Sequence, residues 1–542
     1  QKKIDEAAEG IAAAEDYETV RELLMENQKL VREVDENYTL SMIRMYQDTT
    51  DEYYRQEFAK QNNAAAMRDN KKFNLALISS PFAEKINQEF GPEFLIGLDK
   101  ENQLFAKGKE LQVKEQELTA RYRQIKAEMK FEFQGKTLSE GELRPVRENP
   151  DREIRREAVT ALYRGFTEQK EALGEILDEL VKVRNEIARV NGFDNYLDYM
   201  NLEKGRREYG EQELAVFRRQ VKEEALPLME RLHEQQRQRL GLEQMTVYDY
   251  NLVFPDGNPK PAGDIKQLYE AAGKMYYGLE QELGEFYDDL LEHELIDAAF
   301  STKKVTGMGF CTQLSKTRMP FVFANSDGTM KDVAVFTHEL GHAYQSYLSM
   351  KKQPLLEYQN MANDIAEIPS KTMEVFAYPY AEEFFGKDAE KFLYMHQHEI
   401  ISEIMFYTMT DEYEAWLYAN PDAALEERCI EYDRIFHMFH PGVDNSEFAE
   451  EIRQGAMLFT NMGIFMFPKY LISYVLSEMC ALEFKERMET EPEQAWRDYK
   501  LLCETGGSLG YAELLNRCNL HPAYEEGAVA RALRGFKQKF MK

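Results

Sequence analysis

Cysteine is scarce in this chain of 542 residues, and the few that occur show no pairing pattern. They are Cys311, Cys429, Cys480, Cys503 and Cys518. An odd number, wide spacing and the lack of any CxxC pair argue against a disulfide framework and against a cysteine-based zinc site. A reducing cytoplasm is the compartment they favour. The first residues, QKKIDEAAEG, lack the apolar core of a signal peptide, and whether a leader was removed before Gln1 stays open.

Basic residues are too few for a protein that binds polyanions. Lys and Arg total 67 against 97 Asp and Glu, which gives a formal net charge of −30. Nucleic acids and anionic membranes need a basic surface to meet their phosphates, so neither is an expected partner. Long apolar runs are also missing, and without a stretch of 18 or more apolar residues no transmembrane helix is expected.

The chain has the apolar content of a globular protein, and its apolar residues recur with helical periodicity. Apolar residues make up 43% and aromatic residues 12%, too much for a disordered chain. Prolines number only 17, and long stretches place apolar residues three and four positions apart, which predicts a mainly α-helical fold. Residues 130–138 alternate like a small hairpin, and residues 248–264, dense in Pro, Gly and Asn, predict an ordered loop.

The most informative segment follows an apolar strand candidate at Phe321 to Ala324. After Asp332, a candidate N-cap, the helical pattern contains His338-Glu339-Leu340-Gly341-His342, an HExxH motif. Residues i and i+4 lie one turn apart on the same helix face, so both imidazoles can reach one metal ion while Glu339 reaches a water beside it. Such a motif is expected by chance roughly 0.02 times in a chain of this composition. The segment therefore predicts a metal site.

The third ligand distinguishes among the zinc peptidase groups. A catalytic zinc takes three protein ligands and keeps one position open. The third histidine of metzincins would fall at residue 348, which is Leu348, and the glutamate of the short-spaced gluzincins would fall near Met361 and Ala362. Neither pattern fits.

The next carboxylate in an apolar helical pattern is Glu367, in NDIAEIPSKTMEVF. A buried carboxylate without a cation costs several kcal/mol, and a metal ion is the obvious cation. Glu367 is therefore the predicted third ligand. Glu374, two turns further on the same face, is a candidate hydrogen-bond partner of a ligand histidine, with a salt-bridged surface glutamate as the alternative.

At this point the chain resembles the thimet oligopeptidase and oligoendopeptidase F family of zinc peptidases, on the branch that includes Pz-peptidases. The likeness is carried by PFVFANSDGTMKDVAVFTHELGHAYQSY and by EIPSKTMEVF, whose Glu367 matches the family's third zinc ligand. The resemblance implies a zincin-like, almost all-helical fold, a small β-sheet beside the HExxH helix, and a deep internal channel that admits unfolded oligopeptides. It implies one zinc ion on His338, His342 and Glu367.

The resemblance also implies where a substrate binds. Phe321 to Ala324 would be an edge strand to which a peptide adds by backbone hydrogen bonds, so Phe321, Phe323 and Ala324 would contact it. A strand buried on both sides is the alternative. The loop of residues 306–310, with Gly309, would border the cleft. We expect an N-terminal helical domain with the hairpin at residues 1–190 and a catalytic domain at residues 191–542.

The C-terminal segment departs from the family pattern. GIFMFPKYLISY stands where the family has HIFxxPFYYIDY, so Gly463 replaces a histidine, and Lys469 and Leu471 replace aromatic residues. Tyr470 and Tyr474 are retained, and one of them would donate a hydrogen bond to the oxyanion of the tetrahedral intermediate.

The expected activity is zinc-dependent hydrolysis of internal bonds in short unfolded peptides, with Glu339 as the proton carrier. A metallocarboxypeptidase is the first alternative, and it would need Arg318 or Lys469 to hold a C-terminal carboxylate. The second is a catalytically weakened, zinc-containing peptide-binding scaffold, because a second family histidine is also lost, at Ala415 in TDEYEA. A helical interaction protein without metal is the third. The oligomeric state stays open.

Overall fold

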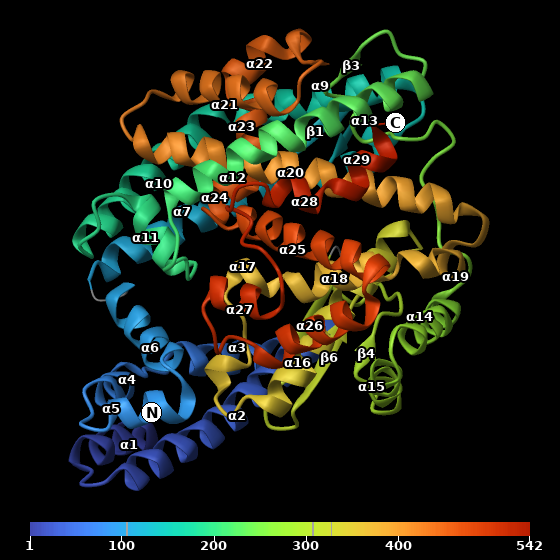
Figure 1. The fold of residues 1–542 in the computed structure, drawn as a ribbon. Coiled ribbons are helices and arrows are strands. Elements are labelled where there is room, and N and C mark those ends of the chain that lie inside the picture. The colour runs from blue at the N-terminus through green and yellow to red at the C-terminus, as the bar shows by residue number, and fades with distance from the viewer. Residues whose placement is uncertain (105–106, 306–307, 327, 542) are drawn as a thin grey trace. The chain divides into compact units, whose positions relative to one another are not determined.

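The computed structural model describes residues 1–104, 107–305, 308–326 and 328–541, and it is mostly helical with a few short strands (Figure 1). The prediction of a mainly α-helical fold is confirmed. The chain divides into two compact units, each built from three segments. Unit 1 comprises residues 1–103, 259–390 and 480–522, and unit 2 comprises residues 104–258, 391–479 and 523–542. The separate domains expected at residues 1–190 and 191–542, and the internal channel, stay predictions.

Unit 1 holds the sheet and the helix with the HExxH motif. Its helices are α1 (Lys2–Ala13), α2 (Tyr17–Gln47), α3 (Glu52–Ala66), α4 (Lys71–Ile78), α5 (Ala83–Phe90), α6 (Glu93–Leu104), α14 (Ile265–Leu279), α15 (Gln281–Glu292), α16 (Met330–Lys352), α17 (Asn363–Ala366), α18 (Ile368–Phe376), α19 (Ala381–Phe385), α26 (Pro492–Thr505) and α27 (Tyr511–Arg517). Its strands are β4 (Ile296–Asp297), β5 (Phe310–Leu314) and β6 (Met319–Phe323).

Unit 2 is built around long helices. They are α7 (Lys109–Glu128), α8 (Glu140–Leu143), α9 (Arg152–Glu168), α10 (Lys170–Val190), α11 (Tyr196–Glu203), α12 (Glu211–Glu224), α13 (Leu226–Arg239), α21 (Leu425–Phe439), α22 (Ala449–Arg453), α23 (Ala456–Thr460), α24 (Met462–Met466), α28 (Ala528–Ala532) and α29 (Arg534–Phe540). Its strands are β1 (Phe131–Phe133), β2 (Lys136–Leu138), β3 (Met245–Thr246) and β7 (Val443–Asp444). Boundaries between the units fall within α20 (Ala389–Ala419), within α25 (Leu471–Thr490) and before the last residue of α6.

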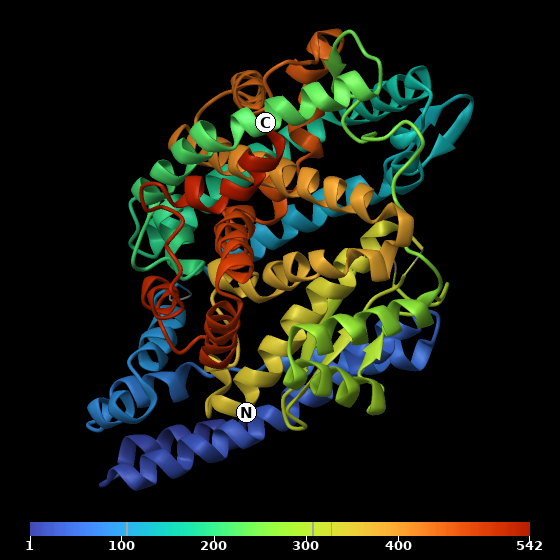
Figure 2. The same ribbon diagram turned by 45° about the vertical axis from the view of Figure 1, so that its right-hand side comes forward.

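The N-terminal helices α1 and α2 lie side by side, as Figure 2 shows in blue. The side chain of Asp16 accepts a hydrogen bond from the Thr19 amide and so caps the start of α2. Near the middle of α2, Glu36 accepts hydrogen bonds from the backbone amides of Lys316 and Thr317, each at 2.7 Å. These bonds tie α2 to the turn between β5 and β6.

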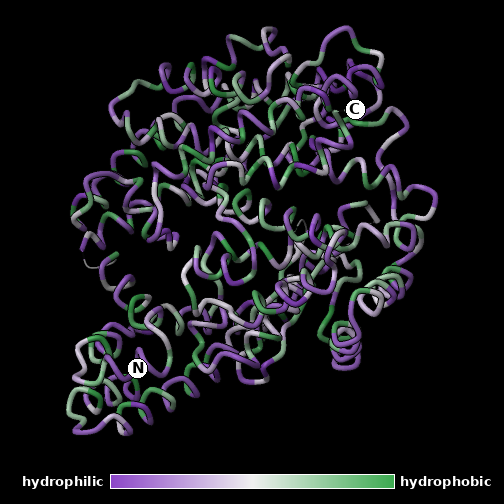
Figure 3. The backbone as a smooth tube through the Cα atoms, viewed as in Figure 1, coloured by the Kyte–Doolittle hydropathy of each residue, from purple (hydrophilic) through white to green (hydrophobic). Residues whose placement is uncertain are grey.

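Polar and apolar residues alternate over short distances along the helices, as the colours of Figure 3 show. Amphipathic helices require this pattern, because one face packs on the core and the other meets water. Among the described residues, no helix is long and apolar enough to cross a membrane.

The three-stranded sheet of unit 1 corrects one prediction. Among the described strands the order is β4-β6-β5, so β6 is the central strand, parallel to β4 and antiparallel to β5. Phe321, Phe323 and Ala324 are all buried, and the Ala324 amide already donates to the Asp297 carbonyl. The prediction of an edge strand that binds substrate through these three residues is wrong, because neighbouring strands use its hydrogen-bonding groups on both sides.

Among the described strands, β4 and β5 are the two edge strands of this sheet, and β5 is the longer. Gln313 is in register with Pro320, which has no N–H, so this pair cannot be a hydrogen-bonded one. In an antiparallel ladder, hydrogen-bonded and non-hydrogen-bonded pairs alternate, so the backbone groups of Cys311 and Gln313 point away from β6. The same alternation explains why β6 tolerates a proline at this position.

Two other sequence predictions are confirmed in unit 2. Strands β1 and β2 form the expected antiparallel hairpin, with Phe131 opposite Leu138. No helix or strand lies within residues 248–264, all of which the structure describes.

Candidate metal centre

Helix α16 carries the motif and begins slightly earlier than its sequence pattern indicates. Its first residue is Met330 and its N-cap is Thr329. Asp332 is therefore not the N-cap, and its carboxylate instead accepts a hydrogen bond from the Gly328 amide at 2.6 Å. The carboxylate lies in the first turn, where the helix dipole favours negative charge.

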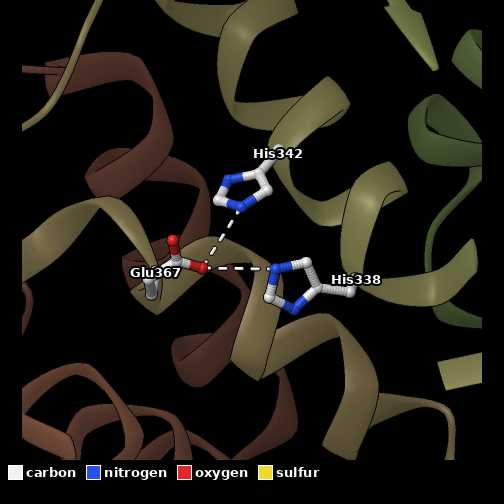
Figure 4. A group of neighbouring side chains, drawn as sticks. All are labelled: His338, His342 and Glu367. Carbon is white, nitrogen blue, oxygen red and sulfur yellow. Dashed lines mark ion pairs between the residues drawn. The ribbon is translucent and has the colours of Figure 1, made fainter. Parts of the chain in front are cut away.

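The side chains of His338, His342 and Glu367 converge on one point (Figure 4). The Oε2 atom of Glu367 lies 3.2 Å from Nε2 of His338 and 3.3 Å from Nε2 of His342. Ligands bound tetrahedrally to zinc at 2.0–2.1 Å lie about 3.3 Å apart. The three ligand atoms lie within 4.8 Å of one another, and the two distances from Glu367 are close to this spacing, so the group could hold one metal ion.

The hydrogen bonding of His338 supports the same reading. Its Nδ1 atom lies 2.6 Å from Oε1 of Glu374, which as a carboxylate accepts the ring proton. A neutral imidazole carries only one N–H, so Nε2 then presents a lone pair toward Glu367. Nε2 and Oε2 lie 3.2 Å apart, so either a proton on Nε2 or a metal ion must lie between them. A carboxylate on the far nitrogen is also the usual partner of a metal-binding histidine.

Glu367 reaches the histidines because α18 packs very closely on α16. The residue stands at the junction between α17 and α18, so the single helix indicated by the sequence is interrupted there. A Cβ atom at Gly341 would lie 2.6 Å from Cα of Ser370 and 2.7 Å from the carbonyl oxygen of Pro369. Only glycine allows this approach. Tyr499 of α26 donates to the same Pro369 carbonyl at 3.0 Å and fixes α18 from its other side.

Burial and the two histidines shift the pKa values of the carboxyl groups in the cluster. Burial raises the pKa of Glu367, but hydrogen bonds from His338 and His342 outweigh it and hold that pKa well below its ordinary value. Burial raises the pKa of Glu339, and the nearby histidines oppose part of that rise.

Glu339 points to the edge of β5. The backbone amide of Cys311 donates a hydrogen bond to its carboxylate. A Cβ atom at Gly309 would lie 3.5 Å from Cγ of Glu339 and 2.4 Å from Cγ1 of Val335. The predicted cleft residue Gly309 therefore lies against the Glu339 side chain. The first two residues of the predicted loop, Thr306 and Gly307, lie outside the described residues.

Sequence reasoning missed the role of Cys311 and its strand. The signal was present: FCTQL and MPFVF are two short apolar-rich runs separated by the polar turn SKTR, which is a hairpin pattern. The apolar run of β6 drew the prediction instead, although a continuous apolar run is typical of a strand buried on both faces.

Tyr470 and Tyr474 lie in unit 2, and no geometry relates them to the metal centre in unit 1. Their hydroxyl oxygens are 3.3 Å apart, within hydrogen-bonding distance. The ring of Tyr474 also packs on that of Tyr407, with centroids 5.8 Å apart. Their predicted catalytic role stays a prediction.

The departures from the family pattern prove to be coupled. A Cβ atom at Gly463 would lie 2.5 Å from Cδ1 of Leu471, so the space that a larger residue at 463 would need is filled by the leucine. Lys469 is completely buried, and its Nζ atom lies 2.5 Å from Oδ1 of Asp411. Arg318 is exposed in the turn at the end of β5.

The chain is similar to known proteins over most of its length. The family model described as Peptidase family M3 matches residues 146–532, and the Peptidase M3 N-terminal domain matches residues 1–105. Oligopeptidase PepF of Bacillus subtilis is 24% identical over 257 residues, which cover 45% of this chain and 35% of that protein. An oligoendopeptidase F homolog of Borreliella burgdorferi is 23% identical over 387 residues, 68% of this chain and 62% of that protein.

The matched parts therefore span less than two thirds of these curated relatives. Among solved structures, Pz peptidase A with inhibitor 2 is 32% identical to this chain. The two superpose with a TM-score of 0.88, and the match covers 100% of this chain and 96% of that one.

Proposed function

Because the chain belongs to peptidase family M3, we propose that it is a zinc-dependent oligoendopeptidase that hydrolyses internal bonds of short unfolded peptides. The observation that carries the proposal is the placement of Glu367 Oε2 at 3.2 and 3.3 Å from the two histidine nitrogens, with Glu339 beside them on the same helix. His338, His342 and Glu367 would hold one zinc ion. The ion, when bound, supplies a Lewis acid and lowers the pKa of a water near it.

In the proposed reaction Glu339 moves the proton. One carboxylate oxygen of Glu339 takes a proton from the attacking water as the water oxygen bonds to the peptide carbonyl carbon. The same carboxylate oxygen then gives this proton to the leaving nitrogen as the C–N bond breaks. The Cys311 amide holds this carboxylate by a hydrogen bond. Glu374 holds His338 through Nδ1. Tyr470 or Tyr474 would donate to the oxyanion, a contribution of about 3 kcal/mol for one donor.

The substrate backbone would add to β5, not to β6. The outward C=O group of Cys311 and the outward N–H and C=O groups of Gln313 are those that an extended peptide can pair with, since the Cys311 N–H already donates to Glu339. A peptide bound along this edge runs beside Glu339, because the Cys311 amide contacts that carboxylate. Gly309 has no side chain and would leave room for the substrate peptide at the start of β5.

The carboxypeptidase alternative loses support from the positions of its two cations. Lys469 is buried and paired with Asp411, so it cannot take up a substrate carboxylate. Arg318 follows Leu314, at the end of β5 away from Phe310 and Glu339. A strand advances about 3.3 Å per residue, so the five residues of β5 separate this arginine from the Glu339 end by roughly 13 Å. A cytoplasmic location is part of the same proposal.

The test is mass spectrometry of a pool of peptides after incubation with zinc-loaded protein, beside the Glu339→Gln variant. Internal cuts by the wild type and their loss in the variant, by roughly 10²-fold or more, are expected. Zinc content is measured in both, because glutamine at 339 removes the proton carrier and none of the proposed ligands. Trimming only from C-termini would favour the carboxypeptidase. Stoichiometric zinc without any cutting would favour the peptide-binding scaffold.

A further inference from the structure

A network of buried charges surrounds Lys469 in unit 2. Its Nζ atom lies 2.5 Å from Asp411 and 3.1 Å from Glu211. The same two carboxylates pair with Arg218, at 2.6 Å for Asp411 and 2.7 Å for Glu211. The lysine and Asp411 are, respectively, 0% and 1% exposed at their side chains. Two cations from different segments thus share two carboxylates, of which Asp411 on α20 is buried and Glu211 on α12 is 25% exposed at its side chain.

The backbone of Lys469 is held as firmly as its side chain. Its amide donates to both carboxylate oxygens of Glu414, at 3.1 and 3.0 Å. Its carbonyl accepts a hydrogen bond from Arg206 at 2.9 Å. Its φ angle is +56°, a left-handed conformation that a residue with a side chain adopts only when its surroundings enforce it.

The held residue lies directly before Tyr470. The Tyr470 amide donates to the Phe467 carbonyl at 3.2 Å, which closes the turn that leads into α25. Arg206 spans this turn, because the same Nη2 atom that binds the Lys469 carbonyl also lies 3.1 Å from Oγ of Ser473. The hydrogen bonds of Arg206 to Lys469 and to Ser473, on either side of Tyr470 in the chain, therefore hold the backbone that carries the Tyr470 side chain.

Such a buried charge network adds little by itself to the free energy of unfolding. Burying a lysine with its partners has a desolvation cost that the ion pairs at best offset, and an apolar residue of similar size fills such a site at least as well. What charged groups add is direction, because hydrogen bonds and ion pairs are satisfied in one arrangement only. The left-handed turn adds a further cost that glycine at this position would avoid.

We propose that Lys469 is a positioning residue, which fixes the turn of residues 467–471 so that the Tyr470 hydroxyl is held for the peptidase reaction. This inference rests on the proposed function. It explains why a lysine stands where the family resemblance has an aromatic residue. Because Lys469 has no access to substrate, it acts through Tyr470.

The experiment is a double-mutant cycle of Lys469→Met and Tyr470→Phe, with kcat and KM measured on a peptide that the wild type cuts. Lys469→Met should lower kcat by roughly 10- to 10²-fold, the effect of a small misplacement of a catalytic group, and change KM little. In the Tyr470→Phe background the same substitution should lower kcat by less than about 3-fold. Lys485→Met is the control, because this lysine lies on α25 and pairs with Glu489 at 2.7 Å, outside the network around Lys469.

Hydrogen exchange of residues 467–474 gives a second measurement that needs no activity. Exchange there should become faster in Lys469→Met and stay unchanged in Lys485→Met. If Lys469→Met does not fold, Lys469→Met with Asp411→Leu replaces it, since this pair also removes the buried carboxylate that loses one of its two cations.

Unchanged kcat, equal losses in both Tyr470 backgrounds, or unchanged exchange would each overturn the inference. A wild type that binds zinc and cuts no peptide would instead refute the proposed function. In that case the exchange data alone decide whether Lys469 fixes the turn.

Discussion

Replacing Gly341 by alanine tests how the metal centre is built. A Cβ atom there would lie 2.6 Å from Cα of Ser370 and 2.7 Å from the Pro369 carbonyl oxygen. Ordinary contacts begin at 3.4 Å, so α16 and α18 must separate by about 0.8 Å. Both atoms belong to the backbone, so no side-chain rotation relieves the clash. Overpacking of this kind destabilises a protein by about 1–3 kcal/mol.

The same separation disturbs the ligands. Glu367 is the N-cap of α18, and the two histidines lie on α16, three residues before and one residue after Gly341. Metal–ligand distances tolerate only about ±0.2 Å, and a shift of about 0.8 Å exceeds this several-fold. We expect zinc affinity to fall by at least about 10-fold, or about 1.4 kcal/mol.

Zinc affinity is measured by competition with a chromogenic chelator, and stability by urea unfolding of the metal-free protein. Gly97→Ala is the control, because nothing lies within 4 Å of a Cβ at that position in α6. Alanine is favoured over glycine there by about 0.8–1 kcal/mol, so this variant should be at least as stable as the wild type. Wild-type stability together with wild-type zinc affinity in Gly341→Ala would refute the close packing of α16 and α18 as the source of the site.

Three further predictions concern charge and burial. Glu374→Gln keeps an acceptor for the 2.6 Å bond from His338 but loses its charge, and chelator competition should show about 10-fold weaker zinc binding; an unchanged affinity would contradict the role of Glu374. Burial lowers the pKa of His233 and of His440 to about 3. A histidine in the unfolded chain titrates near 6.5. Below that pH the unfolded chain binds protons that the two buried histidines do not bind. The free energy of unfolding therefore falls by about 1.4 kcal/mol per pH unit for each histidine as the pH drops toward 3. His233→Phe should lower the slope of unfolding free energy against pH, whereas His293→Gln, at an exposed position, should not. All five cysteines are free and four are buried, so Ellman's reagent should react slowly with the native protein and with five thiols after denaturation; rapid native reaction would contradict the burial.

The helices and the pair of histidines could be predicted because they depend on local geometry. Apolar residues three and four apart require a helix to form one apolar face, and His338 and His342 meet because i and i+4 lie one turn apart. The hairpin at Phe131–Leu138 is equally local. Glu367 was reached by a different argument, the cost of burying a carboxylate in an apolar run, and its distances to the histidines depend on the packing of α18.

Sheet order shows where local patterns stop being sufficient. The apolar run of β6 is the same whether the strand lies at an edge or in the centre, and the position is decided by which strands pair with it. Gln313 opposite Pro320 identifies the free edge only once the register is known. Strand pairing joins residues far apart in the chain, and no periodicity within one strand records its neighbours.

The amino-acid sequence specified the helical rhythm, the residue types of the metal centre and the departures at Gly463 and Lys469. The surroundings of these residues are visible only in the tertiary contacts. Leu471 fills the space beside Gly463, and Lys469 is buried among carboxylates from other helices. The physical reason is the range of the forces involved. Helix geometry acts over a few residues, whereas burial, ion pairing and close helix packing depend on groups brought together from distant segments by folding.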